Sequence, residues 1–211
     1  MKTKNKKVAI LCPSIRPDTH ERIRENLKNT TEDYEIYFLG EEYPSYATAI
    51  NAGYKKTQEP YIFTTDDDVE YSEGWLDECF KKMKGKIQVV GTNDLHNPYV
   101  LGGVHSTHSL VRRKYLDEVG GTWDGGPGTF MTEYHHNYTD TELVEVATAR
   151  GVFAPCLESI VEHFHPVWGN RRADHVTWKT RQNTRQDKAL FNERRKMWVD
   201  KLPPEMQRIQ H

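Results

Sequence analysis

The sequence contains no apolar stretch that approaches the roughly 20 residues needed for a membrane-spanning helix. The basic residues 1–7 are followed by an apolar run of residues 8–11 only, whereas a secretory signal needs roughly 7–15 apolar residues at that place. We therefore predict a chain without a membrane span and without an export signal.

Cysteine is also scarce, with three residues in 211. Cys12, Cys79 and Cys156 are scattered and odd in number, so they do not form the even set that a disulfide framework requires. Reduced thiols are typical of the cytoplasm, and we predict a cytoplasmic protein, in a cell or in an infected host.

A strong charge imbalance is absent as well, because 29 basic against 31 acidic residues give a net charge of −2. The overall charge therefore says little about partners. A length of 211 residues suits one domain that is large enough to bury a hydrophobic core.

What the first half does contain is a regular alternation of strand-like and helix-like segments. β-rich runs at 7–11, 34–39, 61–65 and 87–91 are separated by segments with helical spacing at 18–27, 46–54 and 75–83. This order predicts an α/β domain with a mostly parallel central sheet covered on both faces. In such sheets ligands bind outside the carboxyl ends of the strands.

The second half is less regular. Residues 120–128 are rich in glycine and predict a loop, 143–150 a helix, and 160–161 a short strand leading to His163. No domain boundary is evident, so we predict one domain over residues 1–170, with 171–211 as its basic, helical C-terminal extension.

Three adjacent carboxylates, Asp66, Asp67 and Asp68, follow the strand at 61–65 without a spacer. Such carboxylates repel one another unless a cation or hydrogen-bond donors compensate them. A hard divalent metal with phosphate oxygens would do so, and the position at a strand's carboxyl end favours a site. A solvated acidic turn with capping roles is the alternative.

Residues 45–75 resemble family 2 glycosyltransferases, which have the GT-A fold, a single Rossmann-like domain. Those proteins have an Asn-Ala-Gly helix, a strand, an Asp-x-Asp turn and a short polar stretch before Trp-Leu. The matching residues here are Asn51, Ala52, Gly53, Asp66, Asp68, Trp75 and Leu76. The first loop, with Pro13, Ser14 and Arg16, is similar to the family's nucleotide-facing loop.

The resemblance implies a nucleoside diphosphate sugar donor and Mn²⁺ or Mg²⁺ as cofactor. Asp68 and Asp66 would bind the metal, which offsets charge on the leaving diphosphate. The residues implied to contact the donor are Pro13, Arg16, Asn51, Asp66 and Asp67. Because the second strand ends in Gly-Glu-Glu and not in the Asp-x-x-Ser of many relatives, the nucleotide base stays open.

Asp140 matches the catalytic base of the family's Glu-Asp segment, although Thr139 stands where glutamate is usual. Transfer with inversion needs a carboxylate that takes the proton of the acceptor hydroxyl. The alternative is that Asp140 caps the following helix, and Glu142 and Glu133 are then the remaining candidates for the base.

His163 and His165 share one face of the predicted strand, because residues two apart point the same way. His163 matches a metal-binding histidine of the family and could complete a mixed oxygen and nitrogen shell. His165 is the second choice. The other histidines of the region show no metal-ligand spacing and are assigned to loops or to the acceptor side; they are His105, His108, His135 and His136.

The segment 171–196 is basic, with nine lysines and arginines against three acidic residues, and aromatic side chains are interspersed. Three interpretations are open. The segment is a solvated helix face, or one of its residues, Arg171 or Arg172, contacts the donor diphosphate. In the third interpretation, the segment binds a nucleic-acid acceptor. Small viral relatives that glycosylate hydroxylated bases make DNA the acceptor to test.

Two other functions fit the fold. A sugar-nucleotidyltransferase would need a glycine-rich basic loop after the first strand, and residues 12–16 (CPSIR) contain no glycine. A non-catalytic nucleotide or nucleic-acid binding protein would bind the donor without turnover.

Overall fold

The computed structural model describes residues 7–28, 30 and 33–209. Residues 1–6, on which the prediction of no export signal partly rests, lie outside this range. In the described chain, seven strands form one sheet in the order β2-β1-β3-β6-β5-β7-β4.

The first half of the sheet is parallel. β1 (Val8–Pro13) lies between β2 (Tyr34–Leu39) and β3 (Tyr61–Thr64) and runs parallel to both. A short 3₁₀ turn, η1 (Pro17–Thr19), leads into α1 (His20–Lys28), and α2 (Tyr46–Lys56) connects β2 to β3. β1 is apolar throughout because both of its faces are covered.

The second half of the sheet mixes directions. β6 (Ser109–Arg112) is antiparallel to β3 and to β5 (Val89–Asn93), β5 is parallel to β7 (Phe153–His163), and β4 (Val69–Tyr71) is antiparallel to β7. Among the described strands, all except β4 and β6 therefore share one direction. This confirms the predicted mostly parallel sheet, although the sequence pattern did not indicate β4.

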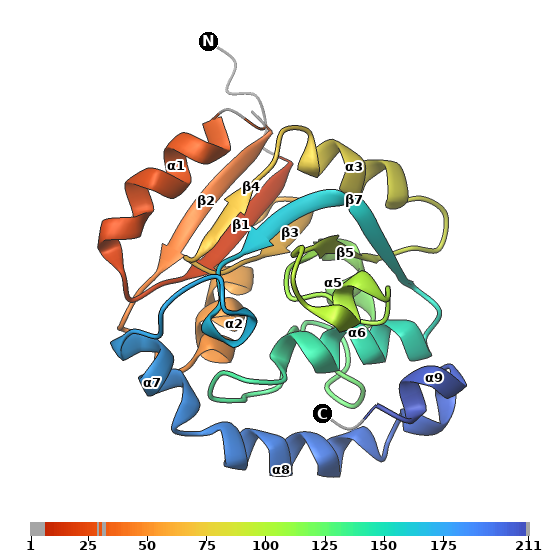
Figure 1. Cartoon of the computed structure of the whole chain (residues 1–211). Coiled ribbons are helices and arrows are strands. Elements are labelled where there is room, and N and C mark those ends of the chain that lie inside the picture. The colour runs from red at the N-terminus through yellow and green to blue at the C-terminus, as the bar shows by residue number, and fades with distance from the viewer. Residues whose placement is uncertain (1–6, 29, 31–32, 210–211) are drawn as a thin grey trace.

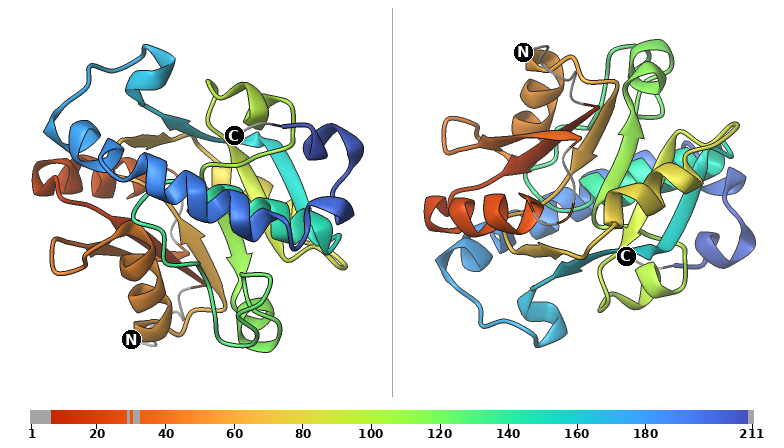
Figure 2. Two further views of the ribbon diagram at one scale, coloured as in Figure 1. Left: turned by 90° about the horizontal axis from the view of Figure 1, so that it is seen from below. Right: turned by 90° about the horizontal axis from the view of Figure 1, so that it is seen from above.

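Helices cover both faces of the sheet (Figures 1 and 2). α1 and α3 (Trp75–Lys82) bury apolar side chains against one face, and α2, α5 (Arg113–Glu118) and α6 (Thr139–Ala149) against the other. The short α4 (Pro98–Leu101) follows β5. Two predicted bounds were wrong: α6 begins at Thr139 and not at 143, and the strand at 160–161 is the end of the long β7.

The C-terminal segment packs on α6. It contains η2 (Pro166–Trp168), α7 (His175–Arg181), α8 (Thr184–Arg195), η3 (Val199–Lys201) and α9 (Pro204–Gln207). A third apolar cluster joins α6 to this segment through Val146, Phe191 and Trp198. Buried ion pairs of Arg194 with Glu142 and of Arg195 with Glu145 reinforce the contact.

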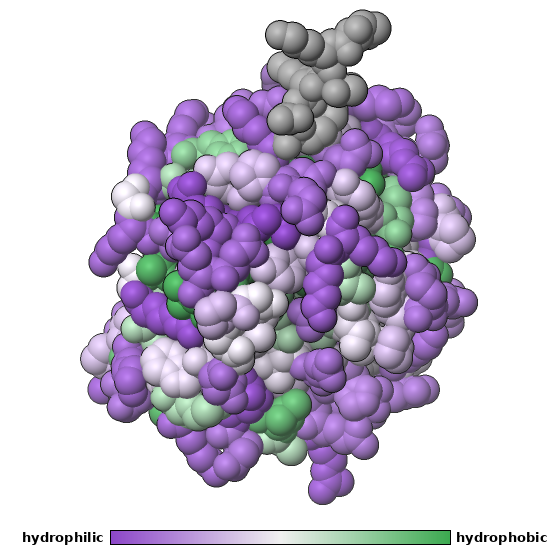
Figure 3. All heavy atoms as spheres, turned by 180° about the vertical axis from the view of Figure 1, so that it is seen from behind, coloured by the Kyte–Doolittle hydropathy of each residue, from purple (hydrophilic) through white to green (hydrophobic). Residues whose placement is uncertain are grey.

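The surface is polar, as the composition suggests, and the three thiols are unpaired. Seen from behind, the molecule is largely hydrophilic, with small apolar patches (Figure 3). Among the described helices, none is long and apolar enough to cross a membrane. Cys12, Cys79 and Cys156 are buried and form no disulfide.

The packing of Trp198 predicts its contribution to stability. Its ring is fully buried and its Nε1 donates to Glu145 at 2.9 Å, so W198A should lower the free energy of unfolding by about 3–5 kcal/mol. Trp178, in the same segment, is 61% exposed. W178A should therefore change the free energy of unfolding by at most about 0.5 kcal/mol. Urea denaturation measures both; equal losses would contradict this account of the packing.

Candidate active site

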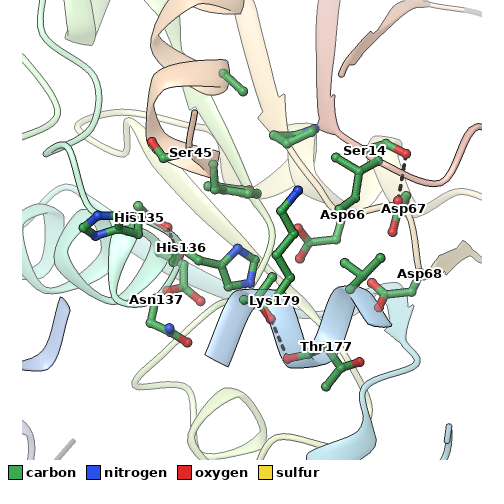
Figure 4. Close-up of a pocket in the computed structure, with 18 of the residues that line it drawn as sticks. Ser14, Ser45, Asp66, Asp67, Asp68, His135, His136, Asn137, Thr177 and Lys179 are labelled. Atoms are coloured by element: carbon green, nitrogen blue, oxygen red, sulfur yellow. Dashed lines mark hydrogen bonds between the residues drawn. The ribbon is translucent and has the colours of Figure 1, made fainter. Parts of the chain in front are cut away.

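A cavity of about 520 Å³ opens where β1 and β3 end (Figure 4). Its lining includes the loop after β1, the segment 39–49 from the end of β2 into α2, and the acidic turn after β3. The loop before β6, the segment 135–141, the end of β7 and α7 complete most of it. Of the predicted site residues, the structure brings together Pro13, Arg16, Asp66, Asp67, Asp68, Asp140 and His163.

Asn51 is the exception. Its amide group donates to the carbonyl of Met131 and accepts from the Met131 N–H, at 3.0 Å each, so it ties α2 to the segment after the glycine-rich loop. Asn51 is not among the residues that line the cavity. The structure therefore places Asn51 in the scaffold, outside the cavity lining.

Asp67 is held by the loop after β1. The Ser14 hydroxyl donates to one carboxylate oxygen at 2.7 Å, and Arg16 forms an ion pair with the other. Burial raises the pKa of Asp67 to about 6, against the opposing effect of Arg16 and Ser14. Asp67 therefore fixes the first loop against the acidic turn.

Asp66 faces two imidazoles. Its Oδ2 lies 3.3 Å from Nε2 of His108 and 4.0 Å from Nε2 of His163. Burial alone would raise the pKa of Asp66, but the two histidines outweigh it and the pKa is lowered. The pKa of His163 is raised, because Asp68 and Asp66 outweigh the effect of burial.

These groups fit a divalent cation. One carboxylate oxygen of Asp66 and one ring nitrogen each of His108 and His163 lie within 4.8 Å of one another. In both rings Nδ1 is buried and has no hydrogen-bond partner among the described residues, so Nε2 is the nitrogen engaged at the site. A mixed carboxylate and imidazole set suits a transition-metal ion such as Mn²⁺.

Asp68 is compensated from the C-terminal side. His163 Nε2 lies 3.3 Å from its Oδ1, and Arg171 donates to its Oδ2 at 2.9 Å. Arg171 also pairs with Asp174, which caps α7 through Thr177. Burial would raise the pKa of Asp68, but His163, Arg16 and Arg171 hold it well below its usual range.

Asp140 lies in the first turn of α6 and not ahead of it. Tyr138 is the N-cap residue, with the left-handed φ of 72° that is rare for a bulky side chain. Asp140 accepts from the Thr141 N–H at 2.8 Å through Oδ1, and its Oδ2 lies 3.3 Å from Nε2 of His105. Burial would raise its pKa, but His105 and the Thr141 amide lower it.

The two fallback candidates for a base are placed elsewhere. Glu142 is buried and accepts from Thr132, Tyr134 and Arg194, so its carboxylate is part of the packing between α6 and α8. Glu133 is exposed and does not line the cavity.

The loop 135–137, which lines the cavity beside Asp140, is held by Asp187 of α8. This buried carboxylate accepts from the backbone N–H groups of His135, His136 and Asn137 at 2.9, 3.0 and 2.9 Å. Burial would raise the pKa of Asp187, but these donors lower it. Phe191, one turn further, stacks on Tyr138 with a centroid distance of 4.9 Å.

A family model described as Glycosyl transferase family 2 matches residues 14–163, a range that contains the acidic turn, Asp140 and His163. The chain belongs to this family. It is a glycosyltransferase. A comparison with curated protein sequences gave no match.

Solved structures show the same fold. Glucosyl-3-phosphoglycerate synthase from Mycobacterium tuberculosis, in complex with Mn²⁺, UDP and glucosyl-3-phosphoglycerate, aligns with a TM-score of 0.57 and 11% identity over 90% of this chain and 80% of that chain. Its complex with Mg²⁺ and UDP also aligns with a TM-score of 0.57 and 11% identity, over 90% and 79%.

Sequence reasoning missed three side chains of this glycosyltransferase. His108 meets Asp66 across 42 residues of sequence and His105 meets Asp140, so no local spacing pairs them. Lys179 of α7 points into the cavity between the acidic turn and His136 (Figure 4). His105 and His108 were assigned to loops or to the acceptor side, and the loop before β6 does hold both. His105 lines the cavity, whereas His108 is fully buried and reaches Asp66.

The anchoring by Asp187 gives a prediction for this glycosyltransferase. D187N replaces a buried carboxylate that accepts three amides, so it should cost about 1–3 kcal/mol of stability and speed amide hydrogen exchange at residues 135–137. The exposed Asp200 gives the control, and D200N should change neither. Wild-type exchange in D187N would show that other contacts hold the loop.

Proposed function

We propose that the protein transfers a sugar from a nucleoside diphosphate donor to an acceptor hydroxyl, with inversion and with a divalent metal. One observation carries this proposal. Asp66 and His163, which form a group suited to a metal together with the buried His108, line the same cavity as Asp68 and Asp140.

The donor side lies at the loop after β1 and the acidic turn. Pro13, Arg16, Asp66 and Asp67 line this part of the cavity, as the family resemblance implies for donor contacts. Lys179 also lines the cavity and adds positive charge that suits a diphosphate (Figure 4). The solved relative was crystallised with UDP, so uridine diphosphate sugars are the first donors to test.

The metal would be Mn²⁺ or Mg²⁺, held by Asp66, Asp68 and His163, with His108 as a further ligand. Both ions occur in the complexes of the solved relative. A bound metal neutralises negative charge on the departing diphosphate. Arg171, which donates to Asp68 at 2.9 Å, would be a candidate to pair with a diphosphate oxygen if the metal took its place on Asp68.

Asp140 is the proposed base. It accepts the proton of the acceptor hydroxyl while that oxygen forms a bond to the anomeric carbon of the donor sugar. The bond from this carbon to the diphosphate oxygen breaks, and its electron pair leaves with the nucleoside diphosphate. The lowered pKa of Asp140 keeps the carboxylate ionised at neutral pH, as a proton acceptor must be.

Two variants test the division of roles. D68N should abolish the metal-dependent rise in melting temperature with nucleoside diphosphates and their sugars, because a ligand that binds only folded protein stabilises it. D140N should keep this rise and lower transfer by about 10²–10⁴-fold.

Donor binding without metal-dependent turnover in wild type, across an acceptor screen, would instead support a non-catalytic binding protein. Equal loss of donor binding in D68N and D140N would show that Asp140 is not the base.

For the acceptor, we propose a hydroxylated base in DNA. The support is a set of exposed side chains on two successive helices: Trp178 and Arg181 on α7, and Arg185 and Lys188 on α8. Arg181 packs over the Trp178 ring at 5.6 Å, and the three cations have no carboxylate partner among the described residues. Cations beside an exposed aromatic ring suit a nucleic acid.

The structure also limits this surface, because Arg171, Arg194 and Arg195 are paired with carboxylates. Reversing the charges of Arg181, Arg185 and Lys188 to Glu should weaken duplex DNA binding and lower its salt slope by about 3. The matched control reverses Lys28, Lys81 and Lys82 on α1 and α3, across the sheet. Absence of DNA binding at low salt would remove DNA as acceptor.

The free, buried thiols support a cytoplasmic location.

The packing of α8 on α6 supports the assignment of residues 171–211 as an extension of the same domain.

A further inference from the structure

Asp140 has a partner that the family resemblance does not assign. Nε2 of His105 lies 3.3 Å from Asp140 Oδ2, and the other oxygen, Oδ1, accepts from the Thr141 N–H at 2.8 Å. The His105 side chain is only 10% exposed, whereas Asp140 is 30% exposed and lines the cavity. The carboxylate is thus held at both oxygens and still faces the cavity.

The loop that carries His105 is itself fixed. Gly103 has a left-handed φ of 73° in the turn after α4, and the Thr107 hydroxyl donates to the buried Asp94 at 2.9 Å. The Ser106 hydroxyl donates to the carbonyl of His108. His105 therefore reaches Asp140 from a short loop with anchors on both sides and not from a free surface segment.

This loop also connects the two halves of the site. His105 contacts Asp140, and three residues later His108 contacts Asp66 of the acidic turn. Residues 105–108 therefore contact both the proposed base and the metal cluster.

We propose that His105 is a positioning residue for the transfer reaction: its Nε2 holds the Asp140 carboxylate so that it meets the acceptor hydroxyl in one orientation. This inference rests on the proposed role of Asp140 as the base. A general base must lie within hydrogen-bond reach of the proton that it takes, so an untethered carboxylate loses rate even where substrates still bind.

Other groups near Asp140 also carry or gain charge. His136, on the loop held by Asp187, lowers the pKa of Asp140 as well, and the hydroxyls of Tyr46 and Tyr138 lie within electrostatic range. Among these groups His105 lowers the pKa of Asp140 most, because its ring is the one in direct contact with the carboxylate. Its removal should therefore raise the pKa of Asp140.

The test compares H105F, which removes the donor, with H105Q, which keeps an N–H donor. H105F should lower kcat on the order of tenfold or more. In a plot of kcat against pH, the acidic limb should move to higher pH. The affinities for the donor and for Mn²⁺ should stay at the wild-type values. H105Q should retain more of kcat than H105F. Melting temperatures establish that each variant is folded.

His96 provides the matched control, because its Nε2 lies 3.0 Å from a carboxylate oxygen of Glu162 outside the cavity lining. H96Q should leave the position of the acidic limb unchanged. An H105F enzyme with wild-type kcat and an unmoved acidic limb would overturn the inference, as would an equal loss in H105Q and H105F.

D140N separates this inference from the proposed function. Wild-type transfer by D140N would reject the base itself, and the role of His105 would fall with it. Loss of transfer in D140N, together with normal transfer in H105F, would leave the proposed function intact and reject the positioning role alone.

Discussion

The constraint on which the site depends is the mutual repulsion of Asp66, Asp67 and Asp68 at the end of β3. Three adjacent carboxylates with little exposure are stable only where positive charge and donors surround them. The chain supplies these from separate segments: Arg16 after β1, His108 before β6, His163 at the end of β7, and Arg171 before α7. The same convergence forms the cavity.

The C-terminal segment has an equally direct part in the architecture. Asp187 and Phe191 of α8 hold the loop 135–138, and the left-handed Tyr138 begins the helix that carries Asp140. Strained backbone persists only where surrounding contacts determine it. The segment that composition alone marks as a basic tail therefore supports the start of the helix that carries the proposed base.

Much of the fold could be predicted. The periodicity of apolar residues indicates which faces of helices and strands are buried, and the alternation of strands and helices indicates a sheet with helices on both faces. The direction of β6 and the existence of the three-residue β4 could not, since neither changes the period of the pattern. Asp66, Asp68 and His163 match family positions, and the structure brings them to one cavity. His108 and His105 were missed because their partners are distant in sequence. The contact of Asn51 with Met131 could not be predicted either, because a family motif does not distinguish a scaffold residue from one that lines the cavity.

The contact of Arg171 with Asp68 has a thermodynamic consequence. Arg171 donates to Oδ2 of Asp68, so a cation that took this oxygen as ligand would displace the guanidinium and would bind less tightly because of that competition. A diphosphate offers the released Arg171 a new anionic partner. Metal and donor would then favour each other's binding by the same factor, since linkage between two sites is reciprocal.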